Sequence, residues 1–184
     1  AKGSLAMSKK QTIIKDINAM QGFGSMDVLC VDKTGTLTGD KIVLEYYIDI
    51  LGNESKQVLE YAYLNSLYHT GVKNHLDDAI CHVERMPNFN YLELLKKYKK
   101  LDELPFDYRK YVSVLCENNI NEKSNLNNKN LLIVKGDVET VCKKCTYAEY
   151  RGEVYPMDIQ SVHHIIDEMQ EDGMKVIAVA YKNI

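Results

Sequence analysis

The chain of 184 residues contains two kinds of apolar pattern. The short continuous apolar run at residues 26–32, rich in β-branched residues, is typical of a strand that is buried on both faces. Residues 41–55 predict a further strand that closes at a turn containing Gly52 and Asn53. Further strands are expected at residues 111–117, 130–136 and 174–181.

Other segments have apolar residues at intervals of three and four, which predicts amphipathic helices. Asp137 is suited to cap the start of a helix in 137–145, and Gly173 is suited to end the last helix. A short hairpin arm is expected at 152–156. The helical segments are 54–70, 76–84, 90–98 and 158–173.

Strands and helices alternate irregularly, and several strands are joined by hairpin signals. The asparagine-rich stretch 118–129, for example, predicts a long loop between two strands. We therefore predict an α+β fold with an antiparallel sheet flanked by helices. The run at 26–32 is expected to lie apart from this sheet, in a parallel α/β sheet with Asp32 at its carboxyl end.

Composition narrows the functional classes. Hydrophobic residues make up 45% of the chain and charged residues 27%, as in ordinary globular proteins. The net charge of -3 gives no electrostatic attraction to nucleic acid, so we expect no nucleic-acid partner. The five cysteines are an odd number and lie mostly in apolar runs, which favours reduced thiols. No apolar run approaches the roughly 20 residues of a membrane-spanning helix.

The segment after the first strand carries the most informative chemistry. A carboxylate such as Asp32 can attack a phosphoryl group if cations and amide N–H groups neutralise the transferred oxygens. Lys33, the hydroxyls of Thr34 and Thr36, and the turn permitted by Gly35 can supply such contacts. Taken alone, the same residues could also be an ordinary loop whose side chains satisfy the backbone.

The heptapeptide DKTGTLT at 32–38 resembles the phosphorylation signature of the P-type ATPases. The resemblance implies that Asp32 becomes an aspartyl-phosphate, assisted by Lys33. It also implies that Asp32 and the backbone carbonyl of Thr34 bind Mg²⁺. Related phosphatases have a second Asp where this chain has Thr34, which is consistent with a longer-lived intermediate.

Segments further along resemble the nucleotide-binding domain of the same family, in the family's order. PFDYRKYVSV at 105–114 implies that Phe106 stacks on adenine, and that either Arg109 or Lys110 approaches the nucleotide. KGDVE at 135–139 implies that Lys135 and Gly136 lie beside the base and ribose.

Two more positions follow from the same resemblance. Asp77, in LDDAI, stands where the family has an acid that can reach the adenine amino group. Lys175 replaces an arginine near the phosphates, which keeps the charge but loses the planar fork. The implied ligands are ATP and Mg²⁺. The implied domains are a linker with the first part of a HAD-like phosphorylation domain at 1–40, and a nucleotide-binding domain at 41–184.

The stretch LNSLYHTGVKNHLDDAI at 64–80 is similar to bacterial magnesium-transporting members. The resemblance implies a fragment of a cell-membrane pump, facing the cytoplasm, that partners the remaining phosphorylation, actuator and membrane domains and a transported divalent cation. We expect the fragment alone to bind ATP without turnover. Two alternatives are a soluble aspartate-dependent HAD-type phosphatase and a non-catalytic nucleotide-sensing module.

Overall fold

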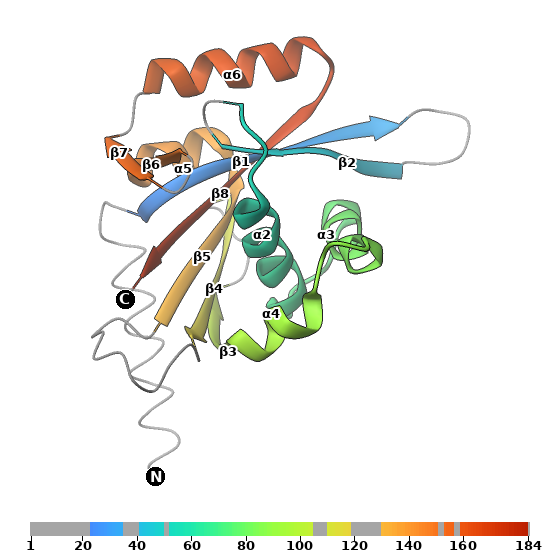
Figure 1. The fold of residues 1–184 in the computed structure, drawn as a ribbon. Helices are drawn as coiled ribbons and strands as arrows, with labels where there is room; N and C mark the ends of the chain where they lie inside the picture. Colours follow the sequence, from blue (N-terminus) through green and yellow to red (C-terminus); the bar gives the residue numbers. More distant parts are fainter. Residues whose placement is uncertain are drawn as a thin grey trace.

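The computed structural model describes residues 23–34, 41–49, 52–104, 110–118, 130–150, 153–156 and 159–183. The fold is α+β, as the sequence predicts (Figure 1). The strands are β1 (Phe23–Thr34), β2 (Lys41–Ile48), β3 (Tyr98–Leu104), β4 (Tyr111–Asn118), β5 (Asn130–Asp137), β6 (Cys145–Tyr150), β7 (Glu153–Pro156) and β8 (Lys175–Asn183). The helices are α2 (Lys56–Tyr68), α3 (His75–Cys81), the 3-10 helix η1 (His82–Arg85), α4 (Tyr91–Lys97), α5 (Val138–Lys144) and α6 (Ile159–Glu171).

Within the described residues, the strands form one eight-stranded sheet in the order β3-β4-β5-β8-β1-β6-β7, with β2 paired to β1. The pairs β3–β4, β4–β5 and β5–β8 are antiparallel and confirm the predicted antiparallel sheet. β1 is antiparallel to β2 and β8, and parallel to β6.

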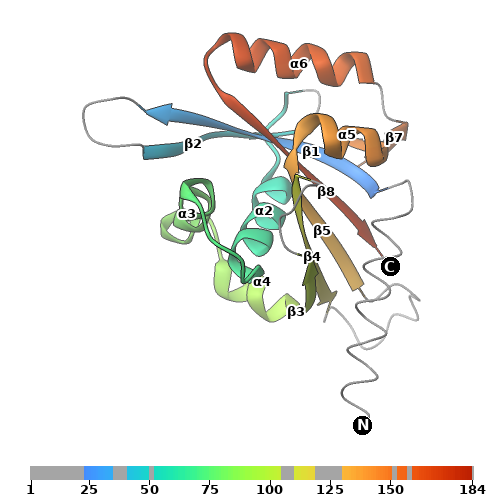
Figure 2. The same cartoon turned by 180° about the vertical axis from the view of Figure 1, so that it is seen from behind.

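Helices cover both faces of this sheet, which explains the continuous apolar runs of its strands. α2, α3 and α4 lie on one face, and α5 and α6 lie on the other (Figures 1 and 2). Neighbouring residues of a strand point to opposite faces. Thus Ile133 of β5 belongs to the core under α2, whereas Leu132 and Val134 belong to the core under α5 and α6.

Local signals set several of the element boundaries. Gly52 has a positive φ of 88° in the turn after β2, and Gly173 has one of 82° after α6. Asp137 caps α5, since its side chain accepts a hydrogen bond from the Thr140 amide. These three boundaries were predicted from the sequence.

The structure differs from the sequence prediction in the neighbours of β1. We expected this strand in a separate parallel sheet, with Asp32 at its end. Instead β1 lies beside β8 and runs two residues past Asp32, pairing with β2. An apolar run specifies burial on both faces but does not specify which strands lie beside it. The proposed domain boundary at residue 40 stays a prediction.

Two strands, β3 and β6, were missing from the prediction. The sequence of β3, YKKLDEL, has charged residues at four of its seven positions and gives no strand pattern. This strand is at the edge of the sheet, where charged residues are common because they discourage pairing with other chains.

No helix in the described part of the chain is both long and apolar enough to cross a bilayer.

Candidate nucleotide-binding site

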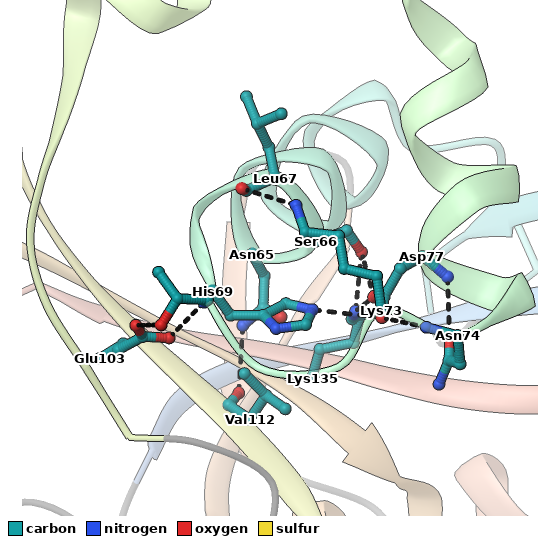
Figure 3. A network of polar contacts seen from close by, with 11 residues as sticks. Asn65, Ser66, Leu67, His69, Lys73, Asn74, Asp77, Glu103, Val112 and Lys135 are labelled. Carbon is teal, nitrogen blue, oxygen red and sulfur yellow. Dashed lines mark hydrogen bonds and ion pairs between the residues drawn. The ribbon is translucent and has the colours of Figure 1, made fainter.

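A buried polar network lies where α2, α3 and β5 meet (Figure 3). α2 delivers Ser66 on its last turn and His69 as its C-terminal cap, α3 delivers Asp77, and β5 delivers Lys135. These four side chains come from sequence positions up to 69 residues apart. All four residues are buried, with exposed fractions between 0% and 5%. Such a cluster must be internally paired, because buried charges are costly without partners.

Asp77 is the centre of the network, and its carboxylate accepts hydrogen bonds from three donors and faces the ring of His69. Oδ1 accepts from Lys135 Nζ at 2.8 Å and from Ser66 Oγ at 2.9 Å. Oδ2 accepts from the Asn74 amide at 3.2 Å. It also lies 3.2 Å from His69 Nε2, but the geometry between these two atoms is not that of a hydrogen bond. A carboxylate offers about four lone-pair directions. Three of these directions at Asp77 are used by protein donors.

The protonation states follow from this pairing. Burial alone would raise the pKa of Asp77, but the neighbouring His69 ring and the charge of Lys135 outweigh it and hold the pKa well below its ordinary value of 3.8. Burial lowers the pKa of the Lys135 ammonium, and the carboxylate of Asp77 acts against that effect. Lys135 also donates to Ser66 Oγ at 2.7 Å, which fixes its head group between two oxygens.

α2 is joined to the sheet directly behind this network by a second buried polar residue. Asn65 Nδ2 donates to the carbonyl of Val112 on β4 at 3.0 Å and to that of Ile133 on β5 at 3.1 Å. One amide group thus bridges two neighbouring strands. It sets the position of the α2 carboxyl end, and hence of Ser66 and His69, relative to β5.

The loop from α2 to α3 is held at both ends. Thr70 donates to Glu103 of β3 from its amide at 2.8 Å and also from its hydroxyl. Lys73 Nζ donates to the Leu67 carbonyl at 3.0 Å, where a cation is favoured by the helix dipole. Between these contacts Val72 is 97% exposed. The loop is thus fixed while its apolar tip faces solvent.

A cavity of about 730 Å³ opens beside the network. Ligand pockets typically span roughly 300 to 1,000 Å³. Apolar side chains from the α2–α3 loop, α3, β4 and β8 form much of its wall. They are Val72, Leu76, Val112, Val176 and Ile177.

Titratable residues also line the cavity. His69, Asp77 and Lys135 are buried, whereas Lys110, Asp137 and Lys175 are exposed. An apolar wall with lysines at the open side suits a ligand with a flat apolar ring and an anionic tail. The residues present therefore fit a nucleotide.

Gly136 marks a very close approach of two strands at the cavity wall. A Cβ built on Gly136 would lie 2.3 Å from the Lys110 carbonyl oxygen and 2.6 Å from the Tyr111 Cβ. The Lys110 carbonyl also accepts from the Asp137 amide at 3.0 Å, and Lys110 itself has a φ of 66°. Only a residue without a side chain fits at 136.

The structure brings four of the six predicted nucleotide-binding residues to this one cavity. Asp77, Lys135, Gly136 and Lys175 all line it. Lys110, which the sequence left as an alternative to Arg109, also lines it. The other two predicted residues, Phe106 and Arg109, lie outside the described residues.

The predicted catalytic residues Asp32, Lys33 and Thr34 are placed by their backbone alone. They form the last three residues of β1 and pair with Val43, Ile42 and Lys41 of β2. Their side chains, and so the Mg²⁺ site predicted on Asp32 and Thr34, lie outside what the structure describes.

Sequence reasoning missed Ser66 and His69 as parts of the site. The signal was present, because Asn65 and Ser66 are adjacent polar residues that interrupt the apolar and aromatic second half of the helix. Buried polar residues in such a position need partners, and the partners here are on β4, β5 and α3. Only the tertiary structure shows which ones.

Two cysteines on either side of the α5 carboxyl end have the spacing of a zinc pair. Cys142 and Cys145 are both buried free thiols, and burial raises the pKa of each. Among the described residues, no group of three or more His, Cys, Asp or Glu side chains is arranged to hold a metal ion.

Comparison with known proteins decides the family. Residues 50–184 match the family described as P-type ATPase, cytoplasmic domain N. The chain belongs to the P-type ATPases. The recognition based on the DKTGTLT signature and the nucleotide-binding segments is therefore confirmed.

Individual relatives of this P-type ATPase chain are informative about its subclass. It is 40% identical, over 99% of its length, to "Magnesium-transporting ATPase, P-type 1" of Salmonella typhimurium, and 39% identical to the protein of that name in Escherichia coli K12. A calcium-transporting ATPase of Listeria monocytogenes is 27% identical over the whole chain. The chain spans about a fifth of the length of these relatives, 20% to 22%. These matches do not favour the phosphatase or the sensing module.

Proposed function

We propose that this chain is the ATP-binding part of a longer cation pump and that ATP occupies the 730 Å³ cavity beside Asp77. The observation that carries the proposal is the convergence of Asp77, Lys135, Gly136 and Lys175 on one cavity in a chain of this family. Phe106, which the family resemblance places on the adenine, is proposed as the stacking residue.

The chemistry of the lining supports one orientation of the nucleotide. The apolar wall formed by Val112, Val176 and Ile177 suits the purine, whereas the exposed amines of Lys110 and Lys175 suit the phosphates. Asp137 also lines the cavity and repels phosphate, so we expect the polyphosphate to pass on the side of the lysines. In this orientation Lys135 stays paired with Asp77 at the inner end.

The wider activity is proposed from the relatives. Their names include magnesium transport, and we propose that the longer protein transports Mg²⁺ across the cell membrane while this part faces the cytoplasm. Its partners there are the rest of the phosphorylation domain, the actuator and the membrane domains. In the phosphorylation step the Asp32 carboxylate attacks the γ-phosphorus of ATP, the bond to the bridging oxygen breaks, and ADP leaves. The Asp32 carboxylate and the backbone carbonyl of Thr34 would hold Mg²⁺, which would neutralise charge on the transferred phosphoryl group.

ATP binding is tested by titration of the chain, followed through backbone amide resonances. We expect a dissociation constant near the millimolar scale, since one aromatic stack contributes only about 0.5 to 1.5 kcal/mol beyond area burial. Amides of Gly71, Gly136 and Val176 should shift, and that of Glu168 on α6 should not. Shifts spread over α6, or none in the cavity, would exclude this site.

Two variants on the same strand sharpen the test. Lys175→Gln removes an amine from the cavity, whereas Lys182→Gln removes one from the other end of β8. We expect the first to weaken ATP binding about two- to fivefold and the second to leave it unchanged. Phe106→Ala should weaken binding about two- to tenfold, and equal affinities in this variant and the unaltered chain would remove Phe106 from the site.

A further inference from the structure

The loop between α2 and α3, residues 69–74, has an apolar side chain at its tip that packs against little of the protein. Val72 is 97% exposed, and yet it lines the cavity. The other large apolar residues that are exposed in the described part of the chain, Tyr46, Met86 and Leu92, do not line it. A single exposed apolar residue is ordinary on a protein surface, but one at the rim of a ligand cavity can become buried when the ligand binds.

Glu103, on the edge strand β3, holds the first half of this loop. Its carboxylate accepts hydrogen bonds from the Thr70 amide at 2.8 Å and from the Thr70 hydroxyl (Figure 3). Lys100 Nζ donates to the same carboxylate at 3.1 Å. Burial would raise the pKa of Glu103, but these hydrogen bonds lower it overall, so the carboxylate is ionised at neutral pH. Hydrogen bonds to an ionised acceptor are among the stronger ones, and two of them come here from one residue.

The second half of the loop is held from α2 and α3. Lys73 Nζ donates to the Leu67 carbonyl at 3.0 Å, and the Asn74 side chain accepts from the Asp77 amide at 2.9 Å. Val72 therefore lies between anchored residues on both sides. A contact that is held in place before binding costs less ordering entropy when the ligand arrives.

We propose that Val72 packs on the nucleoside part of the bound nucleotide, and that Glu103 is a positioning residue that holds Val72 there through Thr70. This inference rests on the proposed function, because it requires a nucleotide in the cavity. Val72 adds an outer contact to the buried apolar wall, and the ligand itself buries that contact. Within the described residues, neither Glu103 nor Thr70 lines the cavity, so an effect of Glu103 on binding must pass through the loop.

The contact of Val72 is tested by titrating the unaltered chain, Val72→Ser and Leu92→Ser with ATP, followed through the backbone amides of Gly136 and Val176. We expect Val72→Ser to weaken binding about threefold, the effect of partly burying two methyl groups, and Leu92→Ser to leave it unchanged. Leu92 is a suitable control because it is 60% exposed and lies on α4, outside the cavity lining. Since Val72 is almost fully exposed, Val72→Ser should unfold within about 2 °C of the unaltered chain.

A second ligand separates the nucleoside from the phosphates. Adenosine has the ring and the ribose of ATP but no phosphate, so Val72→Ser should weaken the binding of adenosine and ATP by the same factor. Lys175→Gln, by contrast, should weaken the binding of ATP alone. Adenosine that does not shift the cavity amides, or a loss in Val72→Ser that is confined to ATP, would show that Val72 does not contact the nucleoside.

The positioning role of Glu103 is tested by a double-mutant cycle with Val72. Glu103→Ala removes the acceptor for both Thr70 donors and should weaken ATP binding about two- to threefold. If Glu103 acts by holding Val72, the double variant should bind about as weakly as Val72→Ser alone. Independent effects would multiply to about six- to ninefold and would exclude the positioning role.

A second variant keeps the cycle decisive if Glu103→Ala does not fold. Thr70→Val lacks only the hydroxyl donor and then takes the place of Glu103→Ala. Thr70→Ser keeps that donor and should bind ATP as the unaltered chain does. Equal losses in Thr70→Val and Thr70→Ser would show that the hydroxyl contact with Glu103 does not position the loop.

The outcomes separate this inference from the proposed function. If the unaltered chain does not bind ATP, both proposals fail. If it binds ATP and Val72→Ser binds equally well, ATP binding stands and the contact of Val72 is overturned. If Val72→Ser binds more weakly but Glu103→Ala does not, the role of Glu103 is overturned.

Discussion

Asp77 and Lys135 form an ion pair whose two members have little contact with water, and each depends on the other. Breaking a buried pair by removing one partner is strongly destabilising, because the remaining charge is left uncompensated. Asp77→Asn should therefore lower the free energy of unfolding by about 3 to 5 kcal/mol at pH 7, as measured by urea denaturation. The control is Asp78→Asn on the same helix, where the exposed side chain should cost less than about 1 kcal/mol.

The destabilisation caused by Asp77→Asn should depend on pH. The pKa of Asp77 is lowered in the folded state, so the unfolded chain binds more protons as pH falls past its ordinary value of 3.8. The stabilisation is complete above that value and is lost as the pH drops toward the folded pKa. The difference between the unaltered chain and Asp77→Asn should shrink below pH 4, and a difference that is constant down to pH 3 would contradict this assignment.

At the scale of elements, α3 and α4 offer a matched pair of helix caps. Each helix has seven residues and is preceded by an asparagine cap whose side chain accepts from the amide three residues on, at 2.9 Å for Asn74 and 3.1 Å for Asn90. In each helix that third residue is an acid, Asp77 or Glu93. Only the first of these acids belongs to the cavity.

Replacing either asparagine with alanine should cost about 1 kcal/mol of stability, the usual cost of a lost N-terminal cap. Only Asn74→Ala should also weaken ATP binding, because this cap fixes the backbone and carboxylate of Asp77. Thermal unfolding and ATP titration of both variants provide the measurement. Equal ATP affinities in the two variants would show that the cap does not position the site.

The elements also show what sequence patterns can and cannot predict. α2, β5 and β8 were predicted because each buries a long apolar stretch, and the spacing of these apolar residues can be recognised in the sequence. β3 was missed because an edge strand with charged residues has no such requirement. The contacts of Ser66 and His69 were missed for a related reason, since a polar residue in a helix does not specify its partner on another element.

For the whole molecule, family resemblance predicted residues that lie far apart in sequence but meet at one cavity. Asp77 and Lys135 are 58 positions apart, and their contact at 2.8 Å was not deduced from either segment. The neighbours of β1 could not be predicted, because strand order depends on the competition among all strands of the sheet. The antiparallel sheet with helices was predicted because hairpin signals act locally.

The proposed phosphorylation is tested in the longer protein, since it requires the whole catalytic set. Asp32→Asn should abolish the acid-stable phosphoenzyme formed from γ-labelled ATP, because an amide cannot act as the nucleophile. Asp27→Asn, earlier on the same strand, serves as the comparison and should keep the label. Labelling that survives in Asp32→Asn would contradict the assignment of the acceptor.

The close approach of β4 and β5 at Gly136 limits which amino acids can occupy position 136. Because even a methyl group there would overlap the Lys110 carbonyl oxygen, all nineteen alternatives are barred by sterics, whatever their polarity or charge. In a library that randomises the cavity wall, position 136 should return a single amino acid, while apolar neighbours such as Val176 should accept several of similar size. Redesign of the pocket toward another ligand must therefore leave this position fixed and work around it.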